Sequence, residues 1–584
     1  MAYAPVAIRS LSGAHDIQPG DALPDSLTGL LTASAFTYSL AVAPAMFSQG
    51  DHIGDSAIHR DAYNFYLQDN WKLSSRLTMD YGLRYEIDSP IRESARRTSG
   101  PVLNGAGGGV PGAQFLINPQ PGYHLDKKGW GPRVALRWQA KPKSQVLAGA
   151  GITTSIPNLW QDNALTGGTP FVLYPRATAA PGQPVRFGMS ITPEQLPALY
   201  TPGGSLLFAS GSSRDVAGNT VMDLTRFERD LAALTPDHQV TPLVVAGIVG
   251  NFQNGYIGTW TAGIEQHLRG VTINAAYVGT AGEKLPVMDY PNGYPGADAE
   301  FAPYTQFDSA GHAAGGYGAV TLVTNRSHST YHSLQLSAQN SLASFGLGFQ
   351  ASYSFAKSLD DASTVIGAAT APQDPFHANA EKGPSAFDIQ QAGSFSLFQD
   401  LHGDRAPGLR MLGKTVTAGW QLLGIGSAMT GLPFTVNSGV QQTGAGSAGA
   451  DRPDQVGIPV LSTSRTVRED YFGLGAANAS FFHIPTNVPG GTGPNHGRFG
   501  ALGRNTFRGP SFRNLDIALI KNTPLLTRGG SDRAALQFRA EFFNVFNLAT
   551  FGLPSSVVLG PGFGEISHTA GSSRQIQFSL KVIY

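Results

Sequence analysis

The stretch LQDNWKLSSRLTMDYGLRYE, residues 67–86, alternates between apolar and polar side chains. After its two serines, every second residue from Leu77 to Tyr85 is apolar, and the residues between them are polar apart from Gly82. A two-residue period is the signal of a β-strand with one apolar face. The stretch therefore predicts two adjacent strands joined by a tight turn, with an aromatic-rich face and a charged reverse face.

The same period recurs along the rest of the chain. It is clearest in residues 134–138, 347–355, 536–546 and 576–584. Strands of about ten residues with this alternation are typical of β-barrels that cross a membrane. Their apolar faces would contact lipid, and their polar faces would line a wet lumen.

The connections between these segments are of two kinds. Short ones occur at residues 73–77, near Gly270 and at residues 341–344. Long ones, rich in Gly, Pro, Ser and Asn, cover residues 88–130, 156–250, 285–328, 358–388 and 436–510. Short turns at one end and long loops at the other are typical of outer-membrane barrels, whereas compact soluble domains rarely hold such long loops.

We therefore predict an all-β fold, a transmembrane antiparallel β-barrel of the outer-membrane type, over residues 61–584. Residues 1–60 are predicted to be an N-terminal segment with a partial barrel strand, because residues 36–42 alternate in character. A membrane helix over residues 27–50 is possible by length, but Thr, Ser and Pro interrupt it. The first twenty residues lack the basic and apolar regions of a secretory signal.

The composition excludes several classes of protein. Lys and Arg number 40 and balance 40 Asp and Glu, so no net charge points to nucleic acid as a partner. The absence of Cys excludes a disulfide scaffold and a thiolate metal site. A soluble β-sandwich or propeller would also alternate, and a soluble hydrolase would need a paired-carboxylate site. Neither explains a charged fraction of only 14% together with long strands and one-sided loops.

No motif predicts catalysis, a cofactor or a metal, so we do not expect an enzyme. His52 and His59 flank a short segment whose spacing fits no metal motif. The glycines of residues 105–112 have no strand-to-helix context and indicate a loop. Asp360 and Asp361 are expected to be solvated at a strand end. In EFFNVFN, residues 541–547, the two asparagines are expected to complete a turn.

Charged side chains on the polar faces are the candidates for a functional surface, because lumen positions can tune selectivity. The candidate lumen-facing residues are Arg76, Asp80, Arg84, Glu86, Arg137, Arg539 and Glu541.

Several segments resemble strands of TonB-dependent outer-membrane receptors. YLQDNWKLSSRLTMDYGLRYE, residues 66–86, is similar to the barrel of the family. Residues 260–286, 331–340, 351–363 and 419–436 resemble the Oar-like branch, whose members carry a carboxypeptidase-regulatory-like domain. The most specific matches are LGRNTFRGPSFRNLDIALIKNTPL, residues 502–525, and FRAEFFNVFNLATFG, residues 538–552.

The resemblance implies uptake of a bulky nutrient, such as an oligosaccharide, a peptide or a chelate, across the outer membrane of a Gram-negative type bacterium. It implies outer-membrane lipid and the barrel assembly machinery as partners. The family's signal peptide, regulatory-like domain, TonB box and plug are not visible, so only a C-terminal barrel portion is expected. That barrel would be incomplete relative to the 22 strands of the family, and the TonB complex would be a partner only if a plug were supplied.

Two further expectations follow from the resemblance. Phe578 and Tyr584, on the final alternating segment, resemble the C-terminal signal that the assembly machinery reads, although Tyr584 would also suit a lipid-facing position. The alternative function is a surface scaffold for adhesion, in which the barrel anchors long loops without transport.

Overall fold

The structure is a computed structural model of the 584-residue chain. It describes residues 58–94, 98–103, 123–156, 243–292, 303–307, 313–340, 346–363, 377–401, 413–439, 451–457, 480–485, 499–528 and 531–584. It also describes the short pieces 22–23, 37–39, 114–117, 165, 176–178, 185–186, 213–214, 220–223, 309, 372–374 and 471.

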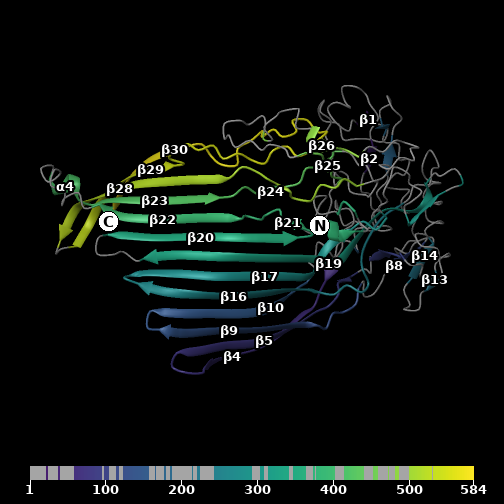
Figure 1. The fold of residues 1–584 in the computed structure, drawn as a ribbon, viewed down its shortest axis with the longest axis horizontal. Helices are drawn as coiled ribbons and strands as arrows, with labels where there is room; N and C mark the ends of the chain where they lie inside the picture. The colour runs from purple at the N-terminus through teal and green to yellow at the C-terminus, as the bar shows by residue number, and fades with distance from the viewer. Residues whose placement is uncertain are drawn as a thin grey trace.

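Thirteen antiparallel strands form a continuous wall, in which strands that follow one another along the chain lie side by side (Figure 1). The wall strands are β4 (Ala62–Lys72), β5 (Leu77–Asp88), β9 (Gly129–Lys141), β10 (Ser144–Ser155), β16 (Gly255–Leu268), β17 (Val271–Asp289), β19 (Ala313–Asn340), β20 (Leu347–Asp360), β22 (Gln391–Leu401), β23 (Trp420–Met429), β28 (Phe512–Arg528), β29 (Ser531–Phe543) and β30 (Gln575–Ile583). The predicted all-β antiparallel fold, including its two opening strands, is confirmed.

The connections alternate between the two ends of the wall. One end holds short turns such as residues 73–76, 142–143 and 269–270, together with the longer connection 402–419 that contains α4 (Lys414–Thr417). The other end holds the remaining long connections, and the short strands within them lie on the right in Figure 1. We call the two ends the turn end and the surface end.

Short strands build an assembly beyond the surface end. They are β3 (Ile58–His59), β6 (Arg92–Glu93), β7 (Ser99–Pro101), β8 (Gln114–Ile117), β13 (Ser213–Arg214), β14 (Thr220–Asp223), β15 (Leu243–Ile248), β18 (Thr305–Phe307), β21 (Gly383–Pro384), β24 (Pro433–Phe434), β25 (Asp454–Gln455), β26 (Phe482–His483) and β27 (Phe507–Arg508), with the 3₁₀ helix η8 (Ala378–Glu381). Of these, β15 pairs in parallel with β19, and β18 and β21 also pair with wall strands.

The N-terminal segment contributes two short strands that pair outside the wall. β1 (Ala22–Leu23) pairs with β12 (Val185–Arg186), and β2 (Thr37–Ser39) pairs with β11 (Arg176–Thr178). The expected strand at residues 36–42 thus contains β2, whose described partner comes from a long surface connection.

The connection expected at residues 285–328 is much shorter in the structure. β17 continues to Asp289 and β19 begins at Ala313, so both strands extend past the end of their neighbours. Their ladder continues through Asp289 paired with Leu322, and β15 pairs with the far side of β19. Backbone pairing satisfies the hydrogen-bonding groups of these extensions, although their glycine-rich sequence does not predict strands.

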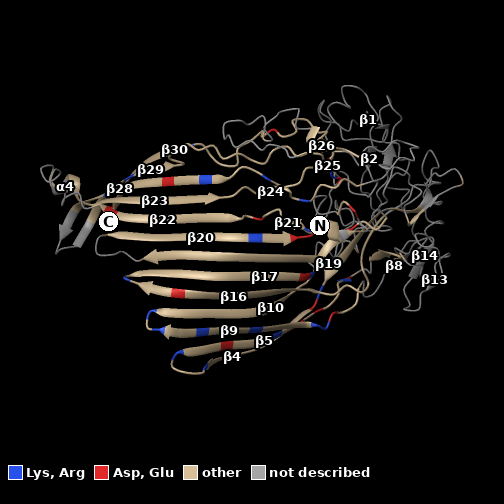
Figure 2. Ribbon diagram, in the orientation of Figure 1, with Lys and Arg blue, Asp and Glu red and all other residues tan. Residues whose placement is uncertain are grey.

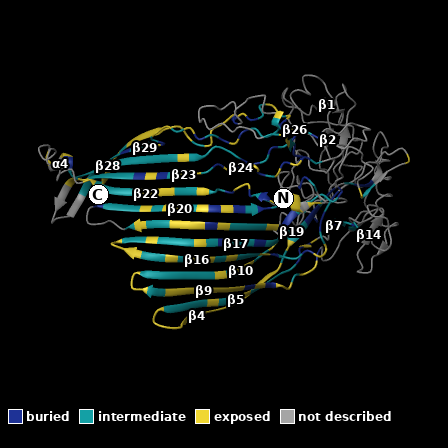
Figure 3. Cartoon of the chain, viewed as in Figure 1, coloured by how far each residue is buried: buried dark blue, intermediate teal, exposed yellow. Residues whose placement is uncertain are grey.

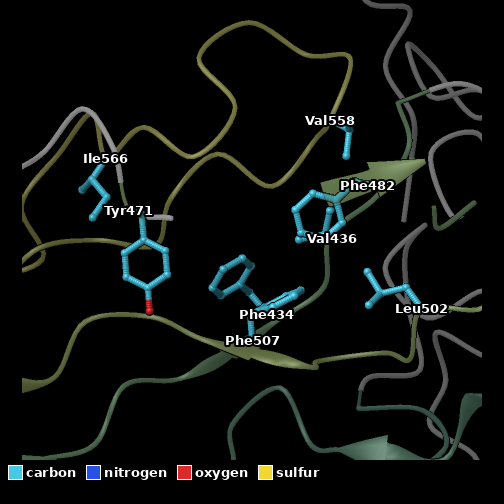
Figure 4. Close-up of a cluster of buried hydrophobic side chains, with 8 residues drawn as sticks. All are labelled: Phe434, Val436, Tyr471, Phe482, Leu502, Phe507, Val558 and Ile566. Atoms are coloured by element: carbon cyan, nitrogen blue, oxygen red, sulfur yellow. The ribbon is translucent and has the colours of Figure 1, made fainter. Parts of the chain in front are cut away.

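Large buried apolar clusters lie in the surface assembly, whereas the wall strands are mostly half-buried or exposed (Figure 3). One group, which we call the surface cluster, joins residues from the last third of the chain (Figure 4). Its members are Phe434, Val436, Tyr471, Phe482, Leu502, Phe507, Val558 and Ile566. A wall that faces lipid has no need of a core of its own, because lipid covers its apolar side.

Two further observations concern the edges of the wall and the helices. Within the described part of the chain β4 and β30 each have one wall neighbour and do not pair with each other, so the barrel is not closed. None of the described helices has the length and apolarity needed to cross a membrane.

Candidate functional site

The register of the wall strands sorts their side chains onto two faces. Because residues paired across a ladder share a face, the pairing can be followed strand by strand from β4 to β30. One face, which we call the polar face, includes Asn70, Asp80, Arg84, Glu86, Arg133, Arg137, Glu265, Asn274, Gln335, Ser352, Ser394, Ser427, Asp516, Arg539, Glu541 and Ser579. The opposite, apolar face is dominated by aliphatic and aromatic residues.

Tryptophan marks the membrane boundaries on the apolar face. The five Trp residues in wall strands all lie on it: Trp71, Trp130, Trp138, Trp260 and Trp420. Three of them lie near the turn end, and two lie toward the surface end. Trp is enriched where a membrane meets water, so two groups on one face indicate the two edges of a lipid-facing band.

The polar face holds six of the seven candidate lumen residues, and Arg76 lies in the turn before β5. Arg84 contacts Glu86 at 2.5 Å, and it donates to Asn64 Oδ1 at 2.9 Å. Near the opposite edge of the sheet, on β29, Arg539 donates to Glu541 at 2.7 Å. Figure 2 shows how few charged residues interrupt the strands between these two groups. The candidates therefore share a face but form two separate groups.

Between those groups the polar face carries a hollow of about 440 Å³, which we call the serine trough. Its hydroxyl groups come from β19, β20, β22 and β23 and belong to Ser337, Ser352, Ser354, Ser394 and Ser427. Asn274, Gln335, Met429 and Phe512 also line it, and none of the lining residues is charged.

Hydrogen bonds inside the serine trough cross from strand to strand. The hydroxyl groups of Ser352 and Ser394 are 2.7 Å apart, and Asn274 Nδ2 donates to Ser337 Oγ at 3.3 Å. Each hydroxyl keeps further donor or acceptor capacity, since a serine oxygen can donate once and accept twice. The trough therefore presents neutral hydrogen-bonding groups beside the apolar Phe512 and Met429. The sequence analysis missed it because its serines come from four separate strands.

A second feature missed from the sequence is a set of buried ion pairs at the surface end, which we call the surface clamp. Arg452 pairs with Glu381, Arg504 with Asp360, and Arg508 with Asp388. All three carboxylate side chains are at most 4% exposed. The pairs tie together the connections that follow β20 and β23.

The surface clamp contradicts the expectation that Asp360 and Asp361 are solvated. Asp360 accepts from Arg504 and Ser363, and Asp361 accepts from Ser327 and from the backbone N–H of His328 at 2.8 Å. The expectation was wrong because Arg504 comes from a connection 144 residues away.

The backbone conformation and hydrogen bonds of Asn505 position the segment GRNTFRGP, residues 503–510, against its partners. Its φ of +54° is in the left-handed region, which Asn tolerates better than most residues. Its side-chain amide donates to the Pro384 carbonyl at 2.7 Å, and its backbone N–H donates to Thr435 Oγ1 at 2.9 Å. This single residue therefore holds Arg504 between the two connections that it bridges.

The surface cluster packs against the surface clamp. The hydroxyl of Tyr471 donates to the backbone carbonyl of Arg508, and its ring packs edge-on to Phe434 at a centroid separation of 5.9 Å. Burial raises the pKa of Tyr471 to about 12, because the phenolate would lose its hydration. The phenol therefore stays protonated, and its hydroxyl keeps donating, at ordinary pH.

The structure also shows where the predicted C-terminal signal residues and the predicted EFFNVFN turn lie. Phe578 lies on the apolar face and stacks on Phe538 with centroids 6.3 Å apart, and Tyr584 is fully exposed. The predicted turn in EFFNVFN is confirmed, since Asn544 and Asn547 both have positive φ and the Asn547 N–H donates to the Asn544 carbonyl at 2.8 Å.

The histidine pair does not assemble in the described residues. His59 lies 2.7 Å from Ser94 Oγ, while His52 and the glycine-rich residues 105–112 lie outside the described residues. Groups of three His, Asp or Glu side chains placed to hold a metal do not occur in the described parts of the chain.

The wall, its two faces and its tryptophan bands define an integral outer-membrane β-barrel. The chain belongs to the family described as outer membrane beta barrel domain, which matches residues 12–577. Its location is the outer membrane of a Gram-negative bacterium. No curated protein matches the sequence.

Solved structures that resemble the chain are outer-membrane transporters and receptors. The outer membrane transporter YddB from Escherichia coli is 11% identical, with a TM-score of 0.42 over 90% of this chain and 45% of that chain. The siderophore receptor PirA from Acinetobacter baumannii is 9% identical, with a TM-score of 0.39 over 94% and 51%. The FrpB iron transporter from Neisseria meningitidis is 10% identical, with a TM-score of 0.34 over 94% and 60%. The chain thus spans about half the length of these proteins.

Proposed function

We propose that this outer-membrane protein forms the wall of a TonB-dependent receptor of the Oar-like branch and takes up a bulky nutrient. The observation that carries the proposal is the serine trough, a hollow lined by neutral polar groups on the polar face of the wall. The resemblance of residues 502–525 and 538–552 to that branch supports it. In this proposal residues 61–584 are the C-terminal barrel portion, and energy coupling requires a plug with a TonB box.

The chemistry of the serine trough favours one of the three nutrient classes. A charged chelate or peptide would be recognised best by charged partners, because ion-assisted hydrogen bonds are the strong ones. The trough instead offers neutral hydroxyl and amide groups beside Phe512. Sugar hydroxyls suit such groups, and the apolar faces of sugar rings suit an aromatic side chain. We therefore propose a neutral oligosaccharide as the nutrient.

Uptake of labelled neutral oligosaccharides by cells that produce the full chain, with and without a working TonB complex, tests the proposal. Replacing Ser352 and Ser394 with Leu fills the trough and removes the hydroxyl pair, and should weaken oligosaccharide binding about tenfold. The matched control is Ser579→Leu, because Ser579 lies on the same face but in β30, outside the trough. Equal binding by both variants would overturn the oligosaccharide assignment.

A second proposal is a scaffold for surface adhesion, which the surface clamp favours because it holds the surface assembly by buried pairs. Cells that bind a polymer or another cell equally well without the TonB complex, and that take up no oligosaccharide, would support this function instead of transport.

A further inference from the structure

A row of polar and aromatic side chains lies on the lipid-facing side of the wall. Trp260, Gly279, His332 and Lys357 are direct neighbours across four strands, since each is the register partner of the next. We call these four residues the outward row. Tyr277, two residues before Gly279, faces the same way because strand side chains alternate.

The side chains of the outward row are built against one another. The Tyr277 hydroxyl lies 2.7 Å from His332 Nδ1, and the two rings are stacked with centroids 6.1 Å apart. The Trp260 ring meets the His332 ring edge-on at 6.2 Å. It also covers Gly279, where any Cβ would come within 2.3 Å of the indole. Aromatic packing thus holds His332 in place beside Lys357.

Lys357 is the charged member of the row, and the described residues place no counter-ion beside it. Its side chain is exposed, and none of the described residues forms an ion pair or hydrogen bond with its ammonium group. A cation on the lipid-facing side is costly unless its charge reaches water or an anion. Its position along the strand decides which of these is available.

The outward row lies at the surface edge of the apolar band. From Asn340, the turn-end residue of β19, eight residues lead to His332, which is about 27 Å along a strand and about 20 Å of height at the usual tilt. That height is close to the apolar band of about 25 Å in such barrels. Beyond the row, His328 pairs with Glu283 at 3.1 Å and lies 3.5 Å from Asp361, so the rim there is already polar.

We propose that the outward row binds the phosphate headgroup of an anionic lipid in the outer leaflet of the membrane. Lys357 supplies the charge, His332 supplies a second polar group, and the Trp260 and Tyr277 rings support the headgroup at the level of the membrane surface. The occupant is a membrane lipid because the row faces the bilayer rather than the lumen. This site is independent of the nutrient pathway on the opposite face.

Native mass spectrometry of the full protein, extracted from outer membranes in mild detergent, tests the proposal. The probes are a phosphorylated glycolipid and its dephosphorylated form, added at equal concentration. We expect retention of the phosphorylated form only. Lys357→Gln should weaken that retention about fivefold, which corresponds to about 1 kcal/mol for a basic side chain at an anionic lipid surface. Lys357→Arg should preserve it.

The matched control is Lys521→Gln. Lys521 also lies on the apolar face but at the turn end, over the ring of Trp420 at 5.8 Å. Its loss should leave retention of the outer-leaflet lipid unchanged. If Lys357→Gln fails to insert, His332→Gln reports on the same row and should also weaken retention. Equal losses for Lys357→Gln and Lys521→Gln, equal retention of both lipid forms, or displacement of the lipid by inorganic phosphate would overturn the proposal.

Discussion

Arg452 and Glu381 form a two-pronged ion pair, with Nη1 2.8 Å from Oε2 and Nη2 2.9 Å from Oε1. Both side chains are at most 6% exposed. Arg452 Nε also donates to the Leu502 carbonyl at 2.8 Å, and the Gln373 N–H donates to Glu381 at 2.9 Å. This pair therefore joins two connections that are far apart in the sequence, the one after β20 and the one after β23.

Glu381→Gln is expected to loosen the surface assembly by about 3–5 kcal/mol, because it leaves the buried guanidinium without a counter-charge. Protease cleavage of the surface connections in the membrane-inserted protein measures the effect. Glu86→Gln is the control: its partner Arg84 is 47% exposed, and such a pair contributes about 1 kcal/mol or less. Similar cleavage rates for the two variants would contradict the role of the surface clamp.

Adjacent positions on β19 test which face meets lipid. Leu334 is on the apolar face, and Gln335 lines the serine trough. Leu334→Arg should cost about 2–4 kcal/mol because it places a charge in the apolar band, whereas Gln335→Arg should be tolerated in a wet lumen. The fraction of protein that inserts and shows a heat-modifiable gel shift measures both. A larger loss for Gln335→Arg would mean that the faces are reversed.

Gly279 is expected to be intolerant of a side chain. Its Cβ would lie 2.3 Å from the Trp260 ring, so Gly279→Ala forces the indole to move and should cost about 1–3 kcal/mol. Gly258 on the neighbouring strand has the same orientation, and its nearest neighbour would be 3.9 Å away. Urea unfolding in lipid vesicles should therefore separate Gly279→Ala from Gly258→Ala. Equal midpoints would argue against the packing of the outward row.

The raised pKa of Tyr471 predicts how the stability of the surface assembly changes at alkaline pH. Its pKa rises from 10.0 to about 12 in the folded protein, so the unfolded state loses the proton first. The resulting stability is fully present below pH 10 and is lost as pH rises toward 12. Protease cleavage of the surface connections should accelerate over that range, and Tyr471→Phe should remove this part of the pH dependence. An unchanged profile in Tyr471→Phe would show that another group is responsible.

The wall could be predicted from the sequence because its signal is local. Residues 67–86 announce two strands by alternation alone, and β4 and β5 are found there. Residues 576–584 announce β30 in the same way. The long extensions of β17 and β19 could not be predicted, because they pair with each other and β19 also pairs with β15, which replaces the alternation that a lipid-facing strand would need.

The candidate site was predicted only in part. The alternation placed Arg84 and Glu86 on one face, and the structure brings them into contact. The serine trough was not predicted because its five serines are spread over four strands, and the one or two serines on each strand form no recognisable motif. The prediction for Asp360 was wrong because its ion-pair partner, Arg504, lies far away along the chain, and no local pattern connects the two residues.

The sequence by itself determined that this protein is a strand-built wall with one apolar and one polar face, because a period of two residues sorts side chains without reference to any other strand. Only the tertiary structure decided which residues meet across the wall. A register shift of one residue would turn every side chain of a strand to the other face. The serine trough, the outward row and the surface clamp therefore exist only once that register and the long connections are in place.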